Sequence, residues 1–269
     1  MQGRLSPSVG GKIQAFPSET WKEEFEYAKE CGFDLIDWVI EALDLDKNPL
    51  LTDRGLAEIE RLGNKTGVRV GAVCADYFME YPLLRCSEEQ RKERLEKVLL
   101  FARRLSIAGI PYMELPFVDN SAIQTYDELK QLTKMFSPIL DKIKSLDVTI
   151  SFETSLPPEK LRGFLVELNH PSARANYDMG NSASLGYNPE EELLAYGQDI
   201  VTIHVKDRVL GGGTVPLGTG DTDFDTCFEM LTKIGYQGPY ILQAARGSEE
   251  ISWNKKNRDF LLNYLVKYH

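Results

Sequence analysis

The feature that most constrains the fold is a regular alternation between short apolar or β-branched runs and longer stretches with helical spacing. Apolar residues that recur every three or four positions are typical of helices, whereas the short runs are typical of strands. Three expected helices end at a glycine, as a helix C-terminus often does. The expected helices include residues 20–32, 87–109, 125–145 and 223–235, and the expected strands are residues 35–41, 68–75, 111–117, 147–153, 173–179, 200–207 and 239–245, preceded by a truncated strand at 2–5.

Eight strands that alternate with about eight helices favour one architecture. A (β/α)8 barrel needs about 250 residues, and the chain has 269. Two small domains would also fit this length, but no linker rich in Pro, Gly or Ser divides the chain. An open doubly wound sheet usually has fewer units. We therefore predict an α/β fold, a (β/α)8 TIM barrel, as a single domain over residues 1–269.

The composition is that of a globular protein, with 42% hydrophobic and 27% charged residues. No apolar run approaches the roughly 18 residues of a membrane helix, and the N-terminus lacks the apolar core of a signal peptide, so we expect a cytoplasmic protein. The formal net charge of −10 opposes binding to nucleic acid or to a membrane surface. The four cysteines form no C-x-x-C pair and are expected to be reduced thiols: Cys31, Cys74, Cys86 and Cys227.

Polar side chains occupy one face of several expected strands. Successive side chains on a strand point to opposite sides. In residues 147–153 the polar face carries Ser151 and Glu153, and the same division places Asp178 and His204 on the polar faces of the next two strands. If the apolar faces pack on the helices, the polar faces point into the barrel, and the last polar residue of each strand reaches the mouth.

Glu153, Asp178 and His204 should therefore meet at the carboxyl ends of three consecutive strands. A lone histidine in an apolar run is more often a satisfied core residue than a ligand. Here, however, it would join two carboxylates that would otherwise be buried without partners. Two carboxylates and an imidazole are suitable ligands for Mn²⁺, Mg²⁺ or Zn²⁺. We predict one divalent metal ion at the mouth, bound by these three residues.

Other polar residues leave two interpretations open. His170 lies in an expected helix-to-strand turn and His269 at the end of the chain, and both are expected to be solvated. The glycine-rich loop at 209–223 could approach a phosphate or could simply be mobile. Four more residues, at or near strand ends, could be satisfied buried groups or substrate contacts: Trp38, Glu41, Asp76 and Glu114.

The segments "ISFET", "NYDMGNSAS", "VTIHVKDR", "VPLGTGDTDF" and "GYQGPYILQ" add a resemblance. In order and spacing they resemble segments of the xylose-isomerase-like TIM-barrel family, in particular of L-ribulose-5-phosphate 3-epimerases and of hexulose-6-phosphate isomerases. The resemblance spans the barrel and implies one divalent ion bound through Glu, Asp, His and a final Glu. The first three positions hold Glu153, Asp178 and His204, and the fourth holds Gln243. An amide can coordinate a metal but cannot transfer a proton at neutral pH.

The chemistry that the resemblance implies is proton transfer beside a carbonyl through a cis-enediolate, with a sugar or sugar phosphate as substrate. The ion would act as a Lewis acid, and Glu153 would be the base. Because Gln243 replaces the second carboxylate, an isomerase is favoured over an epimerase. Lys206, Arg208 and Arg246 are candidates for holding sugar hydroxyls or a phosphate, or are solvated charges, and Asn181 is a candidate hydroxyl contact.

Three rival functions differ in what they require. The same family includes dehydratases, which begin with the same proton abstraction but lose water. A barrel that binds a sugar without converting it would tolerate the glutamine. The apurinic endonuclease branch needs three metals and many histidines, and one usable histidine with a charge of −10 argues against it. The sequence does not fix the ion, the sugar or the oligomeric state, and a homo-oligomer is compatible with it.

Overall fold

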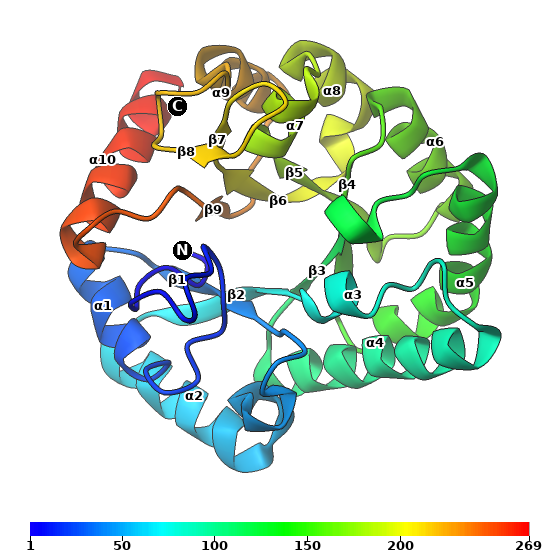
Figure 1. Cartoon of the computed structure of the whole chain (residues 1–269), viewed down its shortest axis with the longest axis horizontal. Helices are drawn as coiled ribbons and strands as arrows, with labels where there is room; N and C mark the ends of the chain where they lie inside the picture. The colour runs from blue at the N-terminus through cyan, green and yellow to red at the C-terminus, as the bar shows by residue number, and fades with distance from the viewer. Residues whose placement is uncertain (269) are drawn as a thin grey trace.

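The computed structural model describes residues 1–268, and its strands form one parallel sheet that curves into a barrel (Figure 1). Neighbouring strands follow the order β1-β2-β3-β4-β5-β6-β9. This confirms the predicted TIM barrel. The prediction for His269 lies outside the described residues. The strands are β1 Leu35–Val39, β2 Arg69–Cys74, β3 Tyr112–Phe117, β4 Thr149–Thr154, β5 Ala173–Asp178, β6 Ile200–Val205 and β9 Tyr240–Leu242.

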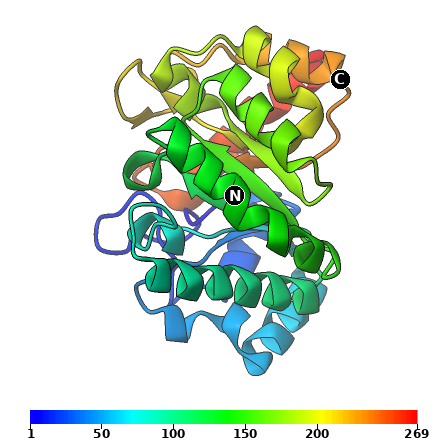
Figure 2. The same ribbon diagram turned by 90° about the vertical axis from the view of Figure 1, so that its right-hand side faces the viewer.

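The helices form an outer ring, and Figure 2 shows α4, α5 and α6 side by side on its surface. The predicted helices are found, each one to three residues shorter at its ends, because the capping residues lie outside the hydrogen-bonded turns. Gly32, Gly109 and Gly235 all adopt left-handed conformations just after their helices, as predicted. The helices are α1 Glu23–Cys31, α2 Asp53–Thr66, α3 Tyr77–Glu80, α4 Glu88–Ala108, α5 Tyr126–Lys144, α6 Pro158–Leu168, α7 Met179–Leu185, α8 Pro189–Tyr196, α9 Phe224–Lys233 and α10 Glu250–Tyr268.

The core lies between the strands and this helical ring. The apolar face of β4 carries Ile150 and Phe152, and both side chains are fully buried. The ring of Phe152 packs edge-on against Phe136 of α5 and Phe164 of α6, with centroids 5.1 and 5.2 Å away. Aromatic contacts of this kind add to the burial of apolar surface. The outward face of the strand is thus fixed on the helices, and its polar face must point into the barrel.

The N-terminal segment closes the barrel between β1 and β9. The amide of Asp37 donates to the carbonyl of Met1 (2.9 Å), and the amide of Gln2 donates to the carbonyl of Leu242 (3.3 Å). The strand predicted at 2–5 is reduced to a single bridge, between Gln2 and Asp37, because hydrogen bonding to β1 does not continue beyond it. In Figure 1 this segment is dark blue and lies inside the ring of helices, beside β1.

One predicted strand has a different end. Residues 200–207 were expected to be continuous, but β6 stops at Val205, and Asp207–Arg208 (β7) turns to pair antiparallel with Thr214–Val215 (β8). The hairpin belongs to the loop that follows β6 and therefore stands at the mouth. All four cysteines are free thiols, as predicted. Within residues 1–268, no helix combines the length and apolarity needed to cross a membrane.

Candidate functional site

Strand register brings the predicted metal-binding residues together. Asp178, the last residue of β5, is the register partner of His204 on β6, and Glu153 lies near the end of β4. Below them, polar side chains contact one another inside the barrel: the hydroxyl groups of Ser151 and Thr202 are 2.7 Å apart. The carboxyl ends of parallel strands meet at one edge, and in TIM barrels this edge carries the active site.

The geometry of the three side chains suits a divalent cation. His204 Nδ1 lies 3.7 Å from Glu153 Oε2 and 3.7 Å from Asp178 Oδ2, and one ligand atom from each of the three lies within 4.8 Å of the others. Ligand bonds of about 2.0–2.6 Å would place neighbouring donors about 3–4 Å apart. All three residues are buried. The donor set therefore fits one ion with little movement.

The other ring nitrogen of His204 faces a second pair of carboxylates. Its Nε2 lies 3.0 Å from Glu114 Oε2 and 4.0 Å from Asp37 Oδ2. Metal-binding histidines commonly hold a carboxylate through the nitrogen that does not bind the metal, and this contact orients the ring. Glu114 thus presents Nδ1 to Glu153 and Asp178. Asp37 was missed from the sequence, although its position between Ile36 and Trp38 placed it on the inward face.

Lys206 lies against two of the predicted metal ligands. Its Nζ is 3.2 Å from Asp178 Oδ2 and 2.5 Å from Gln243 Oε1. The amide nitrogen of Gln243 donates to Gln2 Oε1 and lies 3.4 Å from His204 Nδ1. Gly180 makes room for Lys206, since a Cβ at this position would lie 2.7 Å from its Cγ. Gln243 therefore lies beside the other three predicted ligands, but its side-chain carbonyl oxygen accepts a hydrogen bond from Lys206.

Asn181 and Arg208 hold Glu153 in place through hydrogen bonds. The Asn181 side-chain amide donates to Glu153 Oε1 (2.6 Å), while its backbone amide donates to Asp178 Oδ1 (2.8 Å). Arg208 Nη1 donates to Asn181 Oδ1 (2.7 Å), and its other donors bond to the carbonyl of Gly212. A chain of hydrogen bonds thus runs from the hairpin to Glu153 and fixes its orientation.

Burial and charge give the two carboxylates opposite properties. Burial raises the pKa of Glu153 to about 7, although the charges of His204 and Lys206 oppose this shift. Burial acts on Asp178 in the same direction, but Lys206 and His204 outweigh it and hold the pKa of Asp178 well below its usual range. Burial lowers the pKa of His204, yet the net effect of Glu114 and Asp178 is to raise it well above its usual value. Of these three groups, Glu153 is the one whose pKa lies near neutrality.

One carboxylate binds four backbone amides of the loop after β6. Asp207 accepts hydrogen bonds from the backbone amides of Gly218, Thr219, Gly220 and Thr222, at 2.8 to 3.2 Å. Two glycines of this loop, Gly218 and Gly220, therefore direct their amides to Asp207. Two further residues with open interpretations are similarly occupied: Glu41 accepts from the amide of Phe16, and the Trp38 indole donates to Asn48.

Arg246, a predicted substrate contact, is bonded to the N-terminal segment. Its guanidinium donates to the backbone carbonyls of Gly3, Ser6 and Ile13, at 2.8 to 2.9 Å. Arg246 follows the end of β9, and its donors hold main chain.

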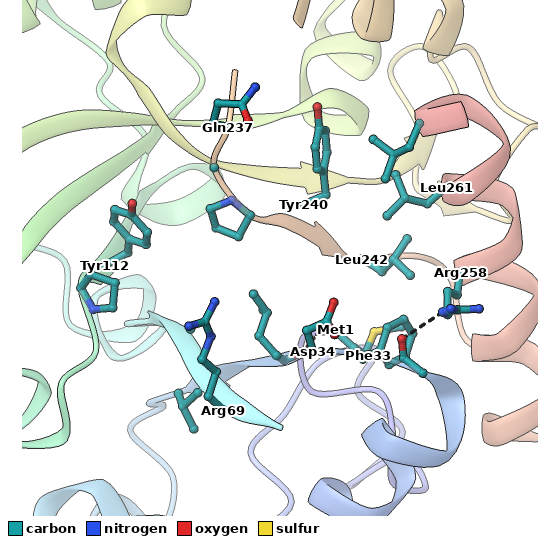
Figure 3. Close-up of a pocket in the computed structure, with 18 of the residues that line it drawn as sticks. Met1, Phe33, Asp34, Arg69, Tyr112, Gln237, Tyr240, Leu242, Arg258 and Leu261 are labelled. Carbon is teal, nitrogen blue, oxygen red and sulfur yellow. Dashed lines mark hydrogen bonds between the residues drawn. The ribbon is translucent and has the colours of Figure 1, made fainter. Parts of the chain in front are cut away.

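A separate cavity of about 620 Å³ lies at the opposite end of the barrel (Figure 3). It is formed where the strands begin, at Leu35, Arg69, Tyr112 and Tyr240, and one side is covered by α10. Arg258 donates to the carbonyl of Gly32 at its edge (2.9 Å). None of the predicted site residues lines this cavity.

Comparison with known proteins agrees with this geometry. Residues 25–264 match the model of the xylose isomerase-like TIM barrel family. L-ribulose-5-phosphate 3-epimerase UlaE of Salmonella typhi is 30% identical over 243 residues, covering 86% of this chain and 84% of that protein. The crystal structure of IOLI protein with a bound zinc atom superposes with a TM-score of 0.78 at 17% identity, over 92% of this chain and 94% of that one.

A family protein from Mycobacterium smegmatis in complex with magnesium has a TM-score of 0.71 at 18% identity, covering 99% of this chain and 94% of that one. The strand order, the polar mouth and the family match lead to one assignment. The chain belongs to the xylose isomerase-like TIM barrel family.

Proposed function

We propose that this protein is a divalent-metal-dependent isomerase of a sugar or sugar phosphate, working in cytoplasmic carbohydrate metabolism. The observation that carries the proposal is the convergence of Glu153, Asp178 and His204 within 4.8 Å at the barrel mouth. The names of its relatives, which are sugar epimerases, support the substrate class. Gln243 is proposed as a fourth, neutral ligand. The ion, of which Mn²⁺ is the first candidate, would supply a Lewis acid for a carbonyl oxygen.

Glu153 is proposed as the base that removes the proton beside the carbonyl. Its pKa of about 7 is close to the value at which a general base is efficient at neutral pH. The amide of Asn181 holds Oε1, which leaves Oε2 directed to the cluster. Glu153 would take the proton from one carbon of the substrate. The same carboxyl group would then return it to the neighbouring carbon. Lys206 lies close enough to oppose the negative charge that develops.

Gln243 favours isomerisation over epimerisation. Inversion at C3 needs groups on opposite faces of the enediolate, whereas an aldose-ketose shift can use one face. Two carboxylates that could have served as a second acid are engaged elsewhere: Glu114 bonds to His204 and Asn176 inside the barrel, and Asp207 holds the loop. Asp76 accepts from Gln14 and Cys74. Glu153 is thus the one carboxylate proposed to carry the proton.

We propose that the substrate's hydroxyls are bound by Asn181, Lys206 and Arg208, which surround Glu153. Arg246 contributes positive charge and holds the N-terminal segment in place. A dehydratase and a sugar-binding barrel are the alternatives, and neither is favoured by a specific contact.

Turnover of a panel of aldose and ketose phosphates in the presence of Mn²⁺ tests the proposal. The expected product has the mass of the substrate when the reaction runs in H2O, and it carries deuterium at C1 or C2 when the reaction runs in D2O. A product lighter by one water molecule would identify a dehydratase. Binding without conversion of any member of the panel would identify a binding protein.

A further inference from the structure

The N-terminal segment places a second cationic side chain over the site. Gln2 is fixed to β1 and β9 by the bridge to Asp37 and the bond to Leu242, and its side chain accepts from Gln243. Arg4 lies two residues further along. Gly3, between them, has a left-handed backbone (φ 52°), so the chain turns there and Arg4 donates back to the carbonyl of Gln2. Arg4 also donates to Gln14, whose amide bonds to Asp76 just after β2, and these contacts place Arg4 at the mouth.

The guanidinium of Arg4 is buried without an anionic partner. The residue is 3% exposed. Its hydrogen bonds in the described chain both come from Nη1, to the carbonyl of Gln2 (2.8 Å) and to Gln14 Oε1 (3.3 Å). Nε is buried without a partner, and within residues 1–268 no carboxylate lies within 4.0 Å of the group. A buried charge is costly unless it is paired, so the arrangement is incomplete without a further oxygen ligand.

Surrounding charges place this group in the field of the site. Burial and the neighbouring charge of Arg246 lower the pKa of Arg4 to about 10, while Asp76 and Asp178 raise it. The side chain is therefore charged at neutral pH. Gln14 links it to the rim, since its amide donates to Asp76 Oδ2 (2.6 Å) just after β2.

Arg246 holds the N-terminal segment that carries Arg4. Its three carbonyl acceptors, Gly3, Ser6 and Ile13, lie on both sides of Arg4 in the chain. Its positive charge adds to that of Arg4, although its donors are used. Two guanidinium groups next to one another repel, and a dianionic ligand would relieve this repulsion. A guanidinium fork matches the oxygen geometry of a phosphate.

We propose that Arg4 binds the phosphate group of the substrate, at the end of the sugar remote from the metal ligands. The proposal rests on the proposed function and adds to it the substrate class, a sugar phosphate. Arg4 is a binding residue that sets specificity, and Arg246 is a positioning residue that holds its segment.

The test compares Arg4→Met and Arg4→Lys with Arg104→Met as a matched control. Arg104 is also largely buried and donates to a main-chain carbonyl, that of Leu50, but it lies on α4 in the outer ring. All variants are first compared with the parent in thermal unfolding. Titration with inorganic phosphate in the presence of EDTA then measures anion binding without metal. We expect Arg4→Met to weaken this binding about tenfold or more, the size expected for charge-assisted hydrogen bonds, and Arg104→Met to leave it unchanged.

Kinetics with a ketopentose 5-phosphate and the free ketopentose complete the test. Arg4→Met should raise KM for the phosphorylated sugar by about tenfold or more, Arg4→Lys by less, and neither should change kcat/KM for the free sugar by more than about twofold. Equal losses with both sugars would overturn the phosphate assignment, as would equal phosphate binding by parent and Arg4→Met. If no sugar is converted at all, the proposed function fails, and phosphate titration still decides the role of Arg4.

Discussion

The two ends of the barrel differ, because one has a large cavity and the other has a group of buried ionisable side chains. The end where the strands begin has the cavity of about 620 Å³, and residues such as Leu242, Leu261 and Tyr112 line it. The mouth is filled by buried ionisable side chains, with His204 and Glu114 at 0% exposure. A cavity arises wherever side chains fail to fill space. A group of buried charges lowers the stability of the fold, so such groups are typical of sites that bind a ligand or catalyse a reaction. We therefore propose that the mouth is the functional end.

The largest expected effect at the mouth comes from Glu153→Gln. The substitution keeps the shape and can still accept from Asn181, but it removes the base. General bases contribute roughly 10²–10⁴-fold to rate, so we expect kcat to fall about a thousandfold. Steady-state kinetics at saturating Mn²⁺ measures this loss. A variant that retains a tenth of the parent's kcat would show that another group removes the proton.

Metal binding should depend on pH in a direction set by the same cluster. In the metal-free protein, Glu153 has a pKa of about 7 and that of His204 is raised. Both groups must lose protons before they can bind a cation. Mn²⁺ affinity should therefore fall as the pH decreases from 8 to 6. Below the pKa of a group that must lose its proton, the fall is about tenfold per pH unit for each such group.

Isothermal titration calorimetry in buffers of different ionisation enthalpy measures this affinity and the protons released. Arg69→Ala, in the cavity at the opposite end of the barrel, provides the control, since it should leave the affinity and the number of protons released unchanged. A constant affinity between pH 6 and 8, with no proton released, would remove Glu153 and His204 from the metal site.

The sequence predicted the parts of this mouth that depend on strand periodicity. Glu153, Asp178 and His204 could be placed on the inward face because each lies in a run whose other face is apolar. The barrel followed from the same alternation. What periodicity cannot supply is the register between strands distant in sequence, and the contact of Lys206 with Gln243 depends on how β6 meets β9.

Loops were harder to predict, because their contacts also depend on segments that pair only in the folded chain. Asp207 seemed to end a strand, and its bonds to four loop amides arise only when the hairpin of β7 and β8 forms. Arg4 gave no signal either, because the segment that carries it forms only a single bridge, at Gln2, and shows no alternation of faces. Arg246 could be placed near the mouth, but the sequence does not show that backbone carbonyls use its donors.

A smaller effect is expected for Gln243→Glu. The new carboxylate would add a negative charge next to His204 and Lys206, and at the effective dielectric constant of about 20 found in proteins this favours a nearby cation by a few kcal/mol. We expect Mn²⁺ affinity to rise about tenfold, because Lys206 competes for the same oxygen. The variant should also gain epimerase activity, measured as deuterium incorporation at C3 in D2O. A parent that already inverts C3 efficiently would contradict the single-base mechanism.

The smallest effects are expected at the opposite end of the barrel, where Arg69 and Tyr112 line the cavity (Figure 3). Arg69 is exposed, and substitutions at such positions usually change the free energy of unfolding by no more than about 0.5 kcal/mol. Arg69→Ala and Tyr112→Phe should leave kcat/KM and Mn²⁺ affinity within about twofold of the parent, because neither residue reaches the metal cluster. Kinetics and thermal unfolding of the two variants, measured beside Glu153→Gln, check this. A loss of activity in Arg69→Ala without a change in stability would mean that the cavity binds a ligand that controls the mouth, and the assignment of function to one end alone would be wrong.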